Sequence, residues 1–111
     1  MPTIHLTISG RVQGVSYRAA ARDTATRLRL TGWVRNTRDG NVELTATGPE
    51  PALKQLITWC HHGPPLAAVA DVSVERIPET PFNGFEILQT PKTPDNPPGT
   101  RKSNLGQDEI P

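Results

Sequence analysis

The sequence of 111 residues is short of several features, and each shortage excludes a class of protein. It has one cysteine, Cys60, so no disulfide forms within the chain and no pair of cysteines binds zinc. No apolar run is long enough to span a membrane, and no signal peptide is visible. The formal net charge is only +1, so the chain as a whole is not an electrostatic partner for nucleic acid. A reduced, cytoplasmic setting is the expectation.

Composition divides the chain near residue 90. Residues 1–89 carry regular apolar spacing and are sufficient for one small domain. Residues 90–111 are punctuated by proline, and Leu105 and Ile110 are their only aliphatic residues. This composition predicts a proline-rich disordered tail, either solvated or docked on a partner.

Apolar spacing within residues 1–89 predicts the order β-α-β-β-α-β, with one further short strand. The expected strands cover residues 3–9, 33–37, 41–47, 69–77 and 82–88. The expected helices cover residues 17–29 and the stretch that begins at the prolines 49 and 51 and ends at Gly63. This order implies an α+β fold of the ferredoxin-like βαββαβ type, an antiparallel sheet with two helices on one face.

Four side chains have a structural expectation. His5 falls on the polar face of the first strand and is expected in solvent. Tyr17 and Trp33 are expected in the core. Cys60 lies on the apolar stripe of the second helix, so it is expected to be a small core residue and not a nucleophile.

The segment from Gly10 to Arg18, G-R-V-Q-G-V-S-Y-R, connects the first strand to the first helix. Gly10 and Gly14 let the backbone bend so that several N–H groups converge, and the first N–H groups of a helix have no partner inside it. A phosphate oxygen satisfies such groups. Arg18, one residue into the helix, is placed to add a bidentate contact. The segment therefore predicts a phosphate-binding loop, and it contains no acidic side chain that would repel the anion.

Asn36 lies near the end of the second strand, before an Asp-Gly turn at residues 39–40. An asparagine amide can hold a water molecule, but it is not a strong base. Such a site suits a substrate with a good leaving group, because positioning and electrostatics then suffice. A carboxylic–phosphoric anhydride has such a leaving group, whereas a phosphate ester normally calls for a metal pair or a strong nucleophile. No Asp, Glu and His cluster with metal-ligand spacing is visible, so no cofactor is expected.

Each motif alone has a structural explanation, because glycine turns before helices and asparagines before Asp-Gly turns are common. Together they resemble the two signatures of the acylphosphatase family. The first is an aliphatic residue, here Ile8, followed by G-x-V-Q-G-V-x-aromatic-R, here residues 10–18. The second is G-aromatic-V-R/K-N, three residues, G-x-V, five residues and G, which residues 32–48 match without a gap. The resemblance covers about residues 3–88.

The resemblance implies hydrolysis of acyl phosphates to a carboxylate and inorganic phosphate without a metal ion. By position, Arg18 would bind the phosphoryl group and Asn36 would orient the attacking water. The substrate would lie in a cradle formed by the backbone of Gln13, Gly14, Val15, Ser16 and Tyr17. The expected partner is a small-molecule acyl phosphate, with no nucleic acid and no membrane, and the protein is expected to be a cytoplasmic monomer.

Two other classes of protein share this architecture. One is a non-catalytic module that binds a small anion or RNA. RNA readers of this fold display aromatic residues on their central strands, and the outward residues expected on the first and third strands include none. The other is an acyl-transfer module of a larger carbamoyl-transferring enzyme, which would need further domains and zinc-binding cysteine pairs.

Overall fold

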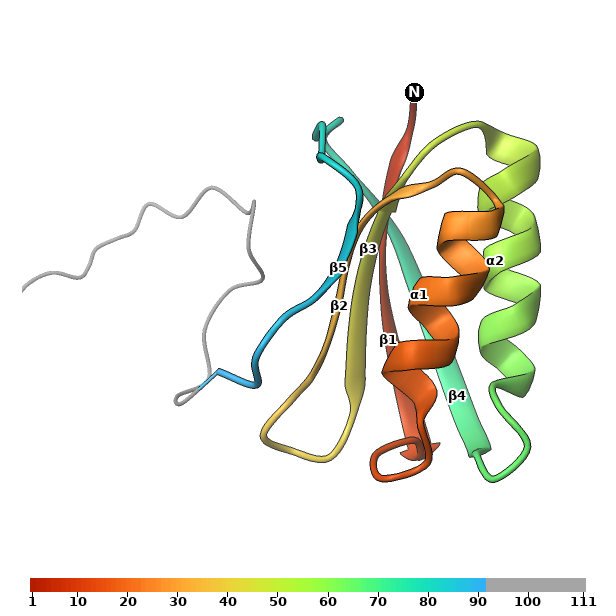
Figure 1. Ribbon diagram of the computed structural model, residues 1–111, viewed down its shortest axis with the longest axis vertical. Coiled ribbons are helices and arrows are strands. Elements are labelled where there is room, and N and C mark those ends of the chain that lie inside the picture. The colour runs from red at the N-terminus through yellow and green to blue at the C-terminus, as the bar shows by residue number, and fades with distance from the viewer. Residues whose placement is uncertain (92–111) are drawn as a thin grey trace, which may run out of the picture.

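In the computed structural model, which describes residues 1 to 91, a five-stranded sheet carries two helices on one face (Figure 1). The strands are β1 (Thr3–Arg11), β2 (Thr31–Asn36), β3 (Val42–Thr47), β4 (Ala68–Ile77) and β5 (Phe85–Ile87). The helices are α1 (Tyr17–Arg27) and α2 (Glu50–His62). The expected order of elements is confirmed. Within the described residues, no helix is long and apolar enough to cross a membrane.

The strands lie in the order β4-β1-β3-β2-β5. β1 pairs antiparallel with both β3 and β4, and β3 pairs antiparallel with β2. The short β5 joins the edge parallel to β2, so the sheet is mixed at that edge and not antiparallel throughout. The connection from β4 to β5 runs past the start of β1, where the Thr80 N–H donates to Thr3 Oγ1 at 2.9 Å and the Thr47 hydroxyl donates to the Thr80 carbonyl at 2.7 Å.

The core lies between the sheet and the helices. Alternate residues of β1, namely Ile4, Leu6 and Ile8, are at most 5 % exposed. Ala21 and Ala25 of α1 are fully buried, and their small side chains let this helix pack closely on β2 and β5. The same cluster includes Val34, Val42, Leu44, Ala46, Leu53, Leu56 and Cys60. Each fully buried aliphatic side chain contributes roughly 1.5–3 kcal/mol, so this face supplies most of the burial energy.

Three elements are shorter than the sequence indicates, and one of them, β3, is shorter by a single residue at its start. α1 ends at Arg27, because Arg29 takes a left-handed φ of 61° and the Leu30 N–H turns back to the Ala25 carbonyl at 2.9 Å. The left-handed residue that follows a helix is usually glycine or asparagine. An arginine at this position therefore did not indicate in the sequence that the helix ends here. The last strand covers only residues 85–87 of the expected 82–88.

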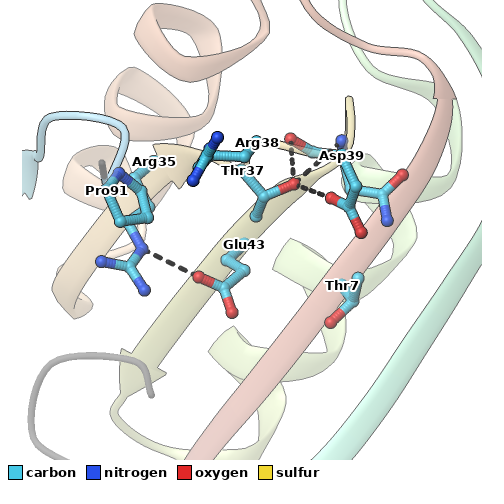
Figure 2. Close-up of a pocket in the computed structure, with 8 residues that line it drawn as sticks. Thr7, Arg35, Thr37, Arg38, Asp39, Glu43 and Pro91 are labelled. Atoms are coloured by element: carbon cyan, nitrogen blue, oxygen red, sulfur yellow. Dashed lines mark hydrogen bonds and ion pairs between the residues drawn. The ribbon is translucent and has the colours of Figure 1, made fainter. Parts of the chain in front are cut away.

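On the sheet face without helices, several outward side chains of β2 and β3 are more buried than strand alternation suggests. Trp33 and Arg35 are 2 % and 5 % exposed. The Arg35 Nε donates to Glu43 Oε1 at 2.8 Å (Figure 2). The same guanidinium lies 5.3 Å from the centre of the Trp33 ring system. Burial alone would raise the pKa of Glu43, but the contacts and charges of His5 and Arg35 outweigh it and hold the pKa below its usual value.

One sequence expectation is wrong on this face. His5 was expected in solvent, but its Nε2 lies 3.5 Å from Glu43 Oε2 and its side chain is 13 % exposed. The register explains this, because His5 pairs with Thr45, which pairs with Trp33 on the next strand. Trp33 was expected in the core. That expectation is confirmed, since Trp33 is 2 % exposed, although its side chain lies on the helix-free side of the sheet.

The loop after β1 and the β2–β3 hairpin lie at the same end of the sheet (Figure 1). The β1–β4 register shifts between Ser9 and Gly10, where Gly10 has a φ of 114°. A Cβ at this glycine would lie 2.3 Å from the Ala68 carbonyl oxygen, so only glycine allows the two backbones to approach here. The bulge leads β1 out of the sheet into the loop before α1.

Candidate active site

The loop between β1 and α1 contains two residues with left-handed backbone. Gly14 has a φ of 74° and Ser16 a φ of 67°. Left-handed residues that alternate with their neighbours turn successive N–H groups toward one side and form an anion-binding concavity. Glycine takes this conformation readily, but Ser16 has a Cβ and holds it at a cost. Strain of this kind clusters at functional segments.

The first turn of α1 is not capped by its own residues. Ser16 is the N-cap residue, yet its side chain makes no capping hydrogen bond, and the first turn has no acidic side chain. Within residues 1 to 91, the backbone N–H groups of residues 13–19 donate to no carbonyl of the chain. The positive end of the helix dipole and these N–H groups are therefore available to an anion.

Arg18 and Asn36 come from different elements and line one pocket. It encloses about 370 Å³ between the start of α1 and the ends of β2 and β5. The lining residues are Val12, Gly14, Ser16, Tyr17, Arg18, Ala19, Asn36 and Ile87. Asn36 Oδ1 is buried and has no hydrogen-bond partner in the described part of the chain. A buried carbonyl oxygen without a donor is a suitable acceptor for an ordered water.

The Gln13 side chain points away from this pocket and connects the loop to the β2–β3 hairpin. Its Nε2 donates to the Thr37 carbonyl at 2.9 Å and to the Asn41 carbonyl at 2.8 Å. The hairpin itself closes through the Thr37 N–H and the Asn41 carbonyl at 2.9 Å. Because Asn36 directly precedes Thr37, the Gln13 amide sets the spacing between the loop and Asn36.

Tyr17 anchors the start of α1 to the end of α2. Its hydroxyl donates to the Cys60 carbonyl at 2.8 Å, and its ring packs on Trp59 with centroids 5.2 Å apart. Burial raises the pKa of Tyr17 well above its usual value, so the phenol stays protonated. Burial also raises the pKa of Cys60 to about 12, which leaves the thiol unreactive near neutral pH. The expectation that Cys60 is a core residue is confirmed.

The structure brings together five of the seven expected site residues at the pocket wall. The other two are Gln13, whose side chain serves the hairpin, and Val15, whose side chain belongs to the core cluster. Sequence reasoning missed the cross-link made by Gln13, because its acceptors are backbone carbonyls. Within residues 1 to 91, no group of three or more His, Cys, Asp or Glu side chains is placed to hold a metal ion. The arrangement can bind an anion through N–H groups and a guanidinium and can hold a water beside it.

Comparisons with known proteins agree with this geometry. A family model described as Acylphosphatase matches residues 4–87. An acylphosphatase of Haloquadratum walsbyi is 51 % identical over 83 residues, covering 75 % of this chain and 89 % of that protein. An acylphosphatase of Methylococcus capsulatus is 47 % identical over 90 residues, covering 80 % and 98 %. The structure of an acylphosphatase from Coxiella burnetii superposes with a TM-score of 0.77 at 42 % identity, covering 78 % and 92 %. The chain therefore belongs to the acylphosphatase family and is a hydrolase of acyl phosphates.

Proposed function

We propose that this protein hydrolyses acyl phosphates without a metal ion, binding the phosphoryl group at the start of α1 and placing the attacking water at the end of β2. Family membership supplies the reaction, and the roles of individual residues are our proposal. The observation that supports it best is the pocket shared by Arg18 and Asn36, with unpaired backbone N–H groups along one wall.

Phosphate binding in this proposal combines two kinds of donor. The N–H groups of Gln13, Gly14, Val15, Ser16 and Tyr17 form the cradle for the phosphoryl oxygens. Arg18 adds a planar guanidinium that can contact two of those oxygens at once. Arg18 makes no ion pair within residues 1 to 91, so its charge is not neutralised by a carboxylate of the described chain.

The chemical step needs little beyond positioning. Water held by Asn36 attacks phosphorus, the bond between phosphorus and the carboxyl oxygen breaks, and the carboxylate leaves with the bonding electron pair. One proton of the water stays on the phosphate and the other passes to a phosphoryl oxygen or to solvent. Because a carboxylate is a weak base, it leaves without a general acid, and Arg18 with the N–H cradle stabilises the charge on the phosphoryl oxygens.

The RNA-binding alternative is not favoured. The comparisons assign the chain to a family of hydrolases. Trp33, the aromatic residue on the outward sheet face, is 2 % exposed and therefore offers no ring face for a base to stack on.

We also propose that the protein acts as a cytoplasmic monomer on small acyl phosphates. Its single cysteine is buried as a thiol, which suits a reducing compartment.

Arg18→Ala should remove nearly all turnover and weaken phosphate binding. A charged hydrogen-bonded contact contributes roughly 1.5–3 kcal/mol, and more where charge develops in a preorganised site. Arg22→Ala is the matched control, because Arg22 is an exposed arginine one turn further along α1. Steady-state kinetics with an aromatic acyl phosphate and calorimetric titration with phosphate measure both effects. Turnover of Arg18→Ala within threefold of the unmodified protein would contradict the assigned role.

Asn36→Ala should leave phosphate affinity nearly unchanged while turnover falls by ~10²-fold or more, because a misplaced water loses the advantage of orientation. The same two assays separate these effects, and far-UV circular dichroism checks the fold. If this variant no longer binds phosphate, Asn36 belongs to the cradle and does not position water.

Gln13→Met keeps the volume of the side chain but removes both donors to the hairpin. We expect a loss of unfolding free energy of roughly 1–3 kcal/mol, because two carbonyls lose a partner. We also expect a larger fall in kcat than in phosphate affinity, because the hairpin that follows Asn36 loosens. Gln55→Met, on the exposed side of α2, is the control. Urea denaturation and kinetics measure the two effects, and unchanged values for both would remove Gln13 from the positioning role.

Turnover should be the same in chelator and in added divalent cations, because the donors in the pocket are N–H groups, a guanidinium and an amide. The assay compares initial rates after dialysis against a chelator with rates after addition of magnesium, manganese or zinc. A loss in chelator that one of these ions restores would establish a metal requirement and overturn this part of the proposal.

A further inference from the structure

The pocket at the start of α1 has an apolar wall that the phosphoryl group and the water do not use. In the proposed function, the polar groups of the pocket hold both of these. The apolar lining residues are Val12, Tyr17, Ala19 and Ile87. Val12 and Tyr17 are each 1 % exposed, so they present almost no surface to a ligand. The accessible apolar surface is therefore that of Ala19, which is exposed, and of Ile87, which is partly buried.

Two elements bring Ala19 and Ile87 to the same pocket. Ala19 is the third residue of α1 and directly follows Arg18. Ile87 pairs in register with Val34 of β2, and the Leu88 N–H donates to the Val34 carbonyl at 2.9 Å. Val34 is a core residue under the helices, and its neighbour Ile87 packs against the same core while α1 lies on β5. Because β5 is an edge strand, Ile87 lines the pocket on the side nearest the sheet edge (Figure 1).

The volume and chemistry of the pocket fit a substrate that extends beyond its phosphoryl group. A volume of about 370 Å³ lies within the range of small-molecule sites and exceeds what a phosphoryl group and one water require. Arg18 is the only lining residue with an ionisable side chain near neutral pH, and its guanidinium is assigned to the phosphoryl oxygens. The rest of the substrate then meets aliphatic carbon, which favours an uncharged apolar substituent.

We propose that Ala19 and Ile87 form the subsite for the acyl group and that the small side chain at position 19 sets the size of the acyl group accepted. The preferred substrates are then acyl phosphates with an uncharged branched or ring substituent beside the carbonyl. This inference rests on the proposed function, because the acyl group reaches this wall only when the phosphoryl group lies in the N–H cradle. The disordered tail predicted for residues 90–111 lies almost wholly outside the described residues, and the subsite uses none of it.

Two substrates of matched reactivity test the subsite. Acetyl phosphate and cyclohexanecarbonyl phosphate release alkyl carboxylates of similar basicity. The ratio of their kcat/KM values therefore reports how well the acyl group fits and not how easily it leaves. We expect the unmodified protein to favour the cyclohexanecarbonyl substrate at least tenfold, and a smaller preference would overturn the proposal.

Ala19→Leu should fill the subsite and lower this ratio at least tenfold, with kcat/KM for acetyl phosphate and inhibition by inorganic phosphate changed less than threefold. The helix should persist, because Ala19 is exposed and leucine is a good helix former. Thr26→Leu, at an exposed position of α1 outside the pocket, is the matched control and should leave the ratio unchanged. A smaller fall in the ratio, a similar fall in the control, or an equal loss for both substrates would overturn the role of Ala19.

Ile87→Val should lower the ratio about fourfold, the effect of removing one methylene from apolar contact. Ile57→Val makes the same change at a partly buried position of α2 and is the matched control. An unchanged ratio in Ile87→Val, or an equal change in Ile57→Val, would remove Ile87 from the subsite. Failure of the proposed function is distinguishable, because Arg18→Ala and Asn36→Ala act on both substrates alike and change the absolute rates, whereas failure of the subsite appears only in the ratio.

Discussion

The candidate active site depends on the backbone N–H groups before and at the start of α1, which have no partner within the described residues. A helix cannot satisfy its own first N–H groups, and the loop before α1 adds more by taking left-handed backbone at Gly14 and Ser16. No acidic or capping side chain satisfies them from within the described chain. An anion can satisfy them, and in the proposed mechanism the charge of Arg18 adds to the attraction. Affinity for a phosphoryl group then follows from backbone groups left unpaired within the described residues, with no dedicated ligand set.

A cradle of this kind works only if it is rigid, because its electrostatic effect depends on donors that are already in place. Two side chains of the same short segment supply the rigidity in opposite directions. Tyr17 reaches into the core and ties the start of α1 to the end of α2. Gln13 reaches outward and ties the loop to both ends of the hairpin that follows Asn36. In the proposed mechanism, the N–H groups of residues 13–17 form the substrate cradle between these two side-chain anchors.

The sequence predicts the parts of this design that local chemistry controls. Alternation and helical spacing are sufficient for the order of elements, and the two motifs are sufficient to select Arg18 and Asn36 for one site. Side chains that act on the backbone give no such signal. The acceptors of Gln13 are carbonyls, which every residue has, and the left-handed Arg29 stands where glycine is usual. His5 was misplaced for a related reason, because alternation tells which face a residue occupies but not whether that face is covered.

The side chains of β2 are buried on both faces of the sheet. Val34 and Asn36 point toward the helices, where one is in the core and the other in the pocket. Trp33 and Arg35 point the other way and are buried as well. Antiparallel sheets commonly leave one face to solvent. A strand held on both faces has less freedom to rotate or to fray. In the proposed mechanism Asn36 positions the attacking water, and β2 is the strand that carries Asn36. Burial of Trp33 on the far side of β2 therefore also supports the proposed chemistry on the near side.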